Sequence, residues 1–138
     1  MRGGFPDSFL AAGPRDSLSW REDFIRTYLE RDIPAFGLRI LPETLRRFWS
    51  MLACSQSGLL NAAKLAAGLG VSGQTAARYL DLLFDLMLMR RLHHWHTNAG
   101  KRLVKSPKVY ICDSGLTHAL LNIETQENLM GHPVIGGS

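Results

Sequence analysis

Apolar residues recur at helical spacing in the first quarter of the chain. The apolar stripe consists of Trp20, Phe24, Tyr28 and Leu29. Spacings of three and four residues place such side chains on one face of a helix. Asp16 or Ser17 is expected to cap this helix, which should end near Arg31 or Asp32 because Pro34 disfavours helical geometry in the residue before it.

A second helix is predicted to begin at Pro42, which a first helical turn tolerates, with Glu43 placed favourably for the helix dipole. Its apolar stripe consists of Leu45, Phe48, Trp49 and Leu52. The segment Gln56–Gly58 breaks the pattern. The aromatic side chains of both helices are interpreted as core, namely Trp20, Phe24, Phe48 and Trp49.

A helix-turn-helix is predicted from Asn61 onward. Asn61 can cap a short helix with a small face that permits close helix approach, formed by Ala62, Ala63, Ala66 and Ala67. Gly70 supplies the turn, Val71 fills the angle between the helices, and Ser72 caps the next helix. In that helix the inward positions are Ala76, Tyr79 or Leu80, Leu83 and Met87, and the outward ones are Gln74, Thr75, Arg78 and Asp81.

After Leu86 the period becomes alternating, which is typical of strands. Leu88–Trp95 is predicted to be a strand, Thr97–Lys101 a turn, and the chain from Val104 or Lys108 to Cys112 the returning strand. A hairpin after a helix-turn-helix is a wing, so a winged helix is expected from about Leu59 to Cys112.

The predicted fold class is mainly α with a small β-hairpin: a helical lead-in followed by a winged helix-turn-helix. Asp113 or Ser114 should cap a last short helix through Leu121. The expected segments are an irregular lead-in (1–15) with a helical turn at Asp7–Ala12 at most, two helices (16–57), the winged helix (58–121), and a tail (122–138) with little core contribution.

Composition favours a soluble, cytoplasmic protein without a membrane segment. Apolar residues make up 46% of the sequence and charged residues 20%, as in ordinary globular proteins. The sequence contains neither a run of eighteen apolar residues nor a signal-like start. Cys54 and Cys112 are expected to be buried thiols and not a disulfide.

The net charge of +4 is unevenly distributed. The segment 86–112 contains no acidic residue and six basic ones: Arg90, Arg91, Lys101, Arg102, Lys105 and Lys108. The rest of the chain holds ten basic against twelve acidic residues. The positive charge therefore belongs to the predicted wing.

Three segments carry a resemblance to a known family. They are Arg2–Pro6, Trp20–Pro34 and Gly100–Leu116. With them the chain resembles the middle portion of predicted bacterial and archaeal ATPases of the AAA superfamily that carry a C-terminal domain of unknown function 4143.

The resemblance implies a larger protein with a nucleotide-binding domain, this winged-helix region, and a nuclease-like domain to which Gly131–Ile135 looks like the entry. The phosphate-binding loop and the acidic Mg-binding strand would precede Met1. ATP and Mg are therefore expected only in that N-terminal domain, and neither a cofactor nor ATPase activity is expected of these residues.

Two chemical motifs in the chain are rejected. Gly68–Thr75 nearly spells a phosphate loop, but Gln74 replaces the lysine and no buried strand precedes the segment. A zinc site from His93, His94, His96 and Cys112 is disfavoured because neighbouring strand residues point to opposite faces and no Cys-x-x-Cys pair is present. No catalytic residue is predicted, because no nucleophile has a recognisable base.

The leading functional hypothesis is binding of double-stranded DNA. The helix after Ser72 would enter the major groove, and the wing would meet phosphates. The predicted contact residues are Ser72, Gln74, Thr75, Arg78, Lys101, Arg102 and Lys105, with Arg90, Arg91 and Lys108 extending the basic surface.

Two alternatives remain open at this point. The winged helix can serve as a protein-docking or inter-domain lid module of the parent ATPase, since Arg78 is balanced by Asp81 and Asp85 on its helix. The other alternative is self-association as a homo-oligomer through apolar surfaces that neighbouring domains would otherwise cover.

Overall fold

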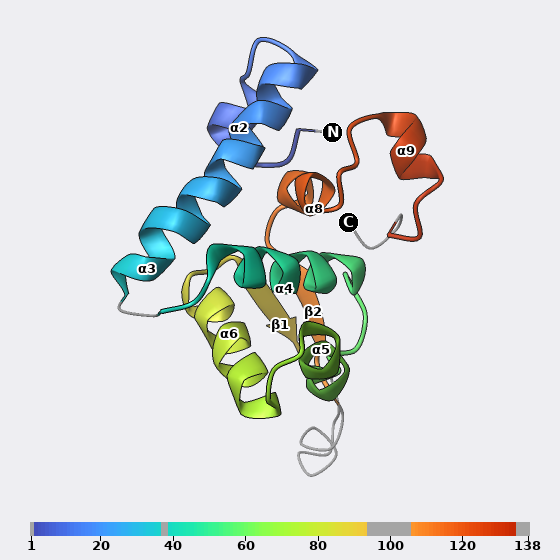
Figure 1. Ribbon diagram of the computed structural model, residues 1–138. Coiled ribbons are helices and arrows are strands. Elements are labelled where there is room, and N and C mark those ends of the chain that lie inside the picture. Colours follow the sequence, from blue (N-terminus) through green and yellow to red (C-terminus); the bar gives the residue numbers. More distant parts are fainter. Residues whose placement is uncertain (1, 37–38, 94–105, 135–138) are drawn as a thin grey trace.

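The computed structural model of the chain describes residues 2–36, 39–93 and 106–134, which are mostly helical (Figure 1). The elements are α1 (Pro6–Phe9), α2 (Pro14–Thr27), the π-helical turn η1 (Tyr28–Asp32), α3 (Ile33–Ala35), α4 (Pro42–Cys54), α5 (Ala62–Leu69), α6 (Gly73–Asp85), β1 (Met89–Leu92), β2 (Lys108–Ile111), α8 (Ser114–Leu120) and α9 (Gln126–Met130).

The winged-helix body consists of α4, α5, α6 and the strands β1 and β2. The two strands pair antiparallel, with Met89 opposite Ile111 and Leu92 opposite Lys108. Their inner faces and the three helices enclose a core that contains Phe48, Trp49, Leu52, Leu83 and Val109, each fully buried. This arrangement confirms the predicted fold class, a mainly α chain with a helix-turn-helix followed by a β-hairpin.

The predicted caps of the helix-turn-helix are confirmed. Asn61 Oδ1 accepts a hydrogen bond from the Lys64 N–H at 2.9 Å, and Ser72 Oγ accepts one from the Thr75 N–H at 3.1 Å. Gly70 lies between the two helices at φ +74°, a left-handed conformation that glycine adopts without steric cost. Of the predicted small face of α5, Ala66 is buried but Ala63 and Ala67 are exposed.

The predicted ends of the first long helix are wrong. Helix α2 begins at Pro14, with Gly13 as its N-cap residue, so Asp16 lies in the first turn. The helical path also continues through Pro34. At η1 the Ile33 N–H donates to the Tyr28 carbonyl, five residues back, and this wider turn lets the chain accept a proline that lacks an N–H.

Strand β1 ends at Leu92, short of the predicted end at Trp95, and β2 begins at Lys108, one of the two predicted starts. Trp95 and Val104 lie outside the described residues. Met87, predicted to face inward, is 81% exposed. Its φ of +57° places it in the left-handed turn between α6 and β1, so the helical period no longer applies there.

Three further expectations are corrected. The tail forms α9, and it contributes the buried side chains Ile123 and Val134. Both cysteines are exposed, because Cys54 is the last residue of α4 and Cys112 follows the inward-facing Ile111 in the alternation of β2. The helical turn near the N-terminus is α1, and it spans Pro6–Phe9.

The N-terminal strap, residues 2–5, packs against the beginning of α8. The Gly4 N–H donates to Asp113 Oδ2, and Asp113 Oδ1 caps α8 by accepting from the Leu116 N–H at 2.8 Å. A Cβ on Gly115 would lie 2.9 Å from the Arg2 carbonyl oxygen. Two of the three segments that carry the family resemblance, Arg2–Pro6 and the end of Gly100–Leu116, therefore meet here.

Within residues 2–36, 39–93 and 106–134, no helix is long and apolar enough to cross a bilayer. The predicted boundaries at residues 15, 57 and 121 stay predictions.

Candidate nucleic-acid interface

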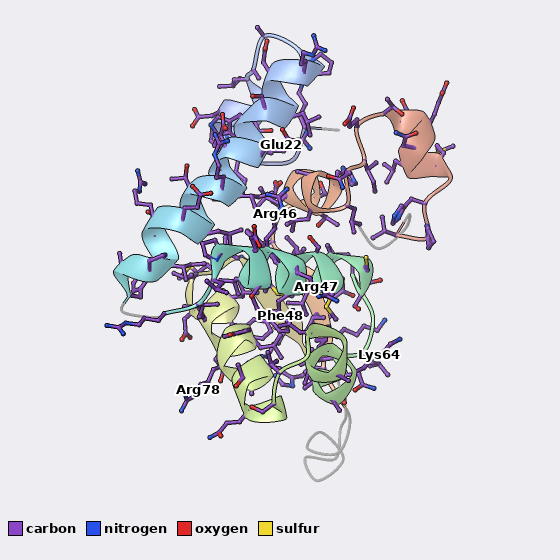
Figure 2. All side chains as sticks on the ribbon, viewed as in Figure 1. Glu22, Arg46, Arg47, Phe48, Lys64 and Arg78 are labelled. Atoms are coloured by element: carbon purple, nitrogen blue, oxygen red, sulfur yellow. The ribbon has the colours of Figure 1, made fainter. Side chains whose placement is uncertain are left out.

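The first half of α6 forms an uncovered surface of the winged-helix body. Ser72, Gln74 and Arg78 are exposed, and Thr75 is half-buried. Figure 2 shows the Arg78 side chain pointing away from α6 into solvent. Four of the seven predicted contact residues are thus brought together on one helix end, while Lys101, Arg102 and Lys105 lie outside the described residues.

The two hydroxyl groups of this helix end are already engaged. Ser72 Oγ and Thr75 Oγ1 lie 2.9 Å apart, and Ser72 Oγ also caps the Thr75 N–H. The N–H groups of Gly73 and Gln74, in the first turn, have no acceptor within the helix. A helix N-terminus with such N–H groups attracts anions such as phosphate. The geometry therefore offers backbone N–H groups to an anion.

The described part of the wing contributes Arg90, Arg91 and Lys108. Arg90 is exposed, and Lys108 is half-buried opposite Leu92. In Figure 1 the first turn of α6 and the ends of β1 and β2 that lead toward residues 94–105 point to the same side of the molecule. The basic wing strands and the α6 N-terminus therefore share one end of the fold.

Arg91 of the wing pairs with an acidic side chain of α6. Its Nη2 lies 2.6 Å from Asp81 Oδ1, and its guanidinium sits over the Phe84 ring at 4.0 Å from the centroid. The pairing joins β1 to α6 across the turn that contains Met87. The sequence did not reveal this exposed ion pair, because the partner of Arg91 lies ten residues earlier on another element.

Two basic residues near this end escaped the sequence prediction. Lys64 is exposed on α5, and Arg47, exposed on α4, donates from Nη2 to the Gly68 carbonyl at 3.1 Å. Figure 2 shows both beside α5. Both residues lie off the apolar stripes of α4 and α5, so the sequence indicated that their side chains face outward. It did not indicate which surface of the fold they would join.

The two chemical motifs rejected from the sequence lie at the α5–α6 junction and at the end of β1. Gly68–Thr75 is the α5–α6 turn, with Gly70 as a helix C-cap and Gly73 opening α6, so its glycines serve a turn between helices and not a phosphate loop. His93 is exposed at the end of β1, and His94 and His96 lie outside the described residues. Among those described, no three His, Cys, Asp or Glu side chains are grouped to hold a metal ion.

The chain has two close relatives among curated proteins. It is 46% identical over all 138 residues to "Uncharacterized protein Rv2008c" of Mycobacterium tuberculosis and equally to "Uncharacterized protein Mb2031c" of Mycobacterium bovis. It spans only 31% of the length of either relative.

Among solved structures, the crystal structure of "transcriptional regulator PA3341" matches with a TM-score of 0.40 and 22% identity, over 88% of this chain and 81% of that one. The sequence profile of a family described as "Domain of unknown function (DUF8612)" matches residues 1–127. The chain therefore belongs to the DUF8612 family.

Proposed function

We propose that the winged-helix body binds double-stranded DNA, mainly through the phosphate backbone. The observation that carries this proposal is the uncovered N-terminal half of α6, where Gln74 and Arg78 are exposed beside backbone N–H groups that have no acceptor in the helix. Anionic phosphate is the ligand that a helix N-terminus with a nearby arginine favours.

The contact is mainly with phosphate and only weakly with bases. The predicted helix contacts offer few groups for base edges. Gln74 and Arg78 are exposed, and the hydroxyl groups of Ser72 and Thr75, which bond to each other, keep one O–H hydrogen between them for a further partner. Lys101, Arg102 and Lys105 of the wing, together with Arg90, supply the remaining positive charge. A protein of this kind binds many sequences with similar affinity and depends strongly on salt.

The positions of the two described chain ends support the same face. The N-terminal strap contacts the start of α8, and in Figure 1 α9 lies on the same side of the molecule as α8. The first turn of α6 lies toward the opposite end of the molecule. Flanking parts of a longer protein would therefore attach near α8 and leave the α6 end open.

The parent protein, in this proposal, is an AAA-type ATPase whose nucleotide-binding domain lies outside these residues. Support comes from the motifs that resemble such ATPases and from the greater length of the mycobacterial relatives. ATP is not expected at Gly68–Thr75, since Gln74 carries no charge for the phosphates and the segment joins α5 to α6. ATP bound by a full-length relative, and not by this chain, is the expected result of a nucleotide-binding assay.

Fluorescence anisotropy with a labelled mixed-sequence duplex at low salt tests DNA binding. Weak, micromolar affinity that falls steeply as salt rises is expected from a few phosphate contacts. Lys101→Ala with Arg102→Ala should weaken binding to all sequences and flatten the salt slope by about 2. Arg78→Ala should weaken it as well, because its guanidinium lies at the α6 end.

The matched control is Arg15→Ala, which removes one exposed positive charge from α2. Its affinity should equal that of the unmodified protein. An equal loss for Arg15→Ala and Arg78→Ala would show nonspecific attraction instead of a defined face.

Protein docking is the second candidate, favoured by the α6 flank where Asp81 holds Arg91 over Phe84. This flank presents Asp85 and a fixed ion pair, and so it is poorly suited to phosphate. No DNA binding at low salt, together with binding of the winged-helix body to the rest of a full-length relative, would support docking and refute the DNA proposal.

A further inference from the structure

The buried polar side chains of the described residues lie in one seam between the lead-in helices and α8. They are Ser8, Ser17, Arg21, Asp113, Thr117 and His118, each at most 7% exposed. Ser8 belongs to α1, Ser17 and Arg21 to α2, and the others to the start and middle of α8. The winged-helix core, by contrast, is apolar.

Hydrogen bonds satisfy most of this seam. Arg21 Nε donates to the Ser17 carbonyl at 3.0 Å, and its Nη1 donates to the Gly115 carbonyl at 2.9 Å across the seam. Ser8 Oγ and Ser17 Oγ lie 2.8 Å apart, and Thr117 Oγ1 donates to the Asp113 carbonyl at 3.2 Å. The Arg21–Gly115 bond holds α2 on α8, and the Ser8–Ser17 bond holds α1 on α2.

His118 is the exception in the seam. It is 5% exposed, and neither Nδ1 nor Nε2 has a hydrogen-bond partner among the described residues. A buried ring without an acceptor is poorly suited to carry a charge.

The charged groups around His118 come from each neighbouring segment. Burial is the main cause that lowers the pKa of His118, the Arg21 guanidinium of α2 is the next in size, and His132 of the final segment adds a smaller effect in the same direction. Asp113 acts in the opposite direction, more weakly than burial or Arg21. Protonation thus adds a positive charge near the Arg21 guanidinium at a buried position.

We propose that the seam is a proton-operated latch, in which a proton taken up by His118 releases α1 and α2 from α8 while the winged-helix body stays folded. The body supplies most of the buried apolar cluster from α4, α5, α6 and the strands, and Ile25, Leu29 and Ile33 of the lead-in helices join the same cluster. None of the buried polar residues belongs to the elements of the body. Opening lets the imidazole reach water, where the positive charge is tolerated.

The direction of the pH effect follows from linkage. In the closed seam the pKa of His118 lies below its ordinary value. In the open seam the ring is exposed to water, and its pKa returns to the ordinary value of about 6.5. The open form therefore binds more protons in acid. The latch has its full stability above that pH and loses stability as the pH falls below it.

Hydrogen exchange of the full chain at pH 7.5 and 5.5, corrected for intrinsic exchange rates, measures the latch directly. Protection of α2 and α8 amides should fall by up to about tenfold at pH 5.5, the ratio expected for one unit below the open-state pKa, while α6 protection stays constant. His118→Gln should abolish the change. His93→Gln, at an exposed position, should retain the full loss of protection at pH 5.5. His132→Gln should retain most of it.

Three results would overturn the latch. They are unchanged protection of α2 and α8 in the unmodified protein, an equal loss in α6, and a loss that persists in His118→Gln. Should His118→Gln fail to fold, an NMR titration of the His118 ring in the unmodified protein replaces it. A ring that titrates below its ordinary value supports the latch, and one that titrates at or above that value refutes it.

Discussion

Replacing Gly115 by alanine tests how tightly the N-terminal strap is held on α8. The added Cβ would lie 2.9 Å from the Arg2 carbonyl oxygen, from Asp113 Oδ1 and from Gly3 Cα. Two of these are backbone atoms that no rotamer change can move. The strap must therefore shift, and the Gly4 N–H must weaken its bond to the Asp113 carboxylate.

The magnitude follows from two contributions. Overpacking costs about 1–3 kcal/mol, and loss of a hydrogen bond to a charged group costs about 1.5–3 kcal/mol. The better helix propensity of alanine offsets up to about 1 kcal/mol. A net loss of about 2–4 kcal/mol is a large share of the roughly 5–15 kcal/mol by which a domain of this size is stable.

Urea unfolding followed by circular dichroism measures this loss. Gly73→Ala is the matched control, because a Cβ there meets nothing within 4 Å at the start of α6. It should leave the free energy of unfolding unchanged or raise it by about 0.5–1 kcal/mol. Equal midpoints for the two variants would refute the steric reasoning.

Three further changes probe the winged-helix body. Phe48→Ala should cost about 3–5 kcal/mol of unfolding free energy because its ring is fully buried, whereas Phe9→Ala, at a ring 60% exposed, should cost much less in the same urea titration. Asn61→Ala should cost about 1 kcal/mol by removing the α5 cap, and an unchanged midpoint would contradict the cap. Asp81→Asn should cost less than about 1 kcal/mol because the pair with Arg91 is exposed, and the cost should shrink in high salt. A salt-independent loss would show another role for Asp81.

The sequence predicted the body of the fold well because local signals agree there. The helix ends are set locally by Asn61, Gly70 and Ser72, through side-chain caps or the backbone freedom of glycine. Such local interactions depend little on the tertiary structure around them. The path through Pro34 could not be predicted, since a π-helical turn depends on how the helix packs and has no reliable pattern. Met87 was misplaced because the helical period was extended one turn too far.

The candidate interface was only partly readable from the sequence. Helix periodicity placed Gln74 and Arg78 outward, as the structure has them. The neutralisation of Arg91 could not be read, because an ion pair between separate elements leaves no spacing in the chain. The polar seam was missed for the same reason, since Arg21 and His118 are far apart in sequence and each reads as an ordinary helix residue.

Met87 is a position at which a substitution can raise the stability of this protein. A non-glycine residue in the left-handed region costs about 1–2 kcal/mol, and here its side chain is left 81% exposed. Glycine would remove both the backbone strain and an apolar surface that invites aggregation, offset in part by the greater entropy of the unfolded chain. The turn between α6 and β1 is therefore the natural starting point for engineering a hardier, more soluble version of the protein.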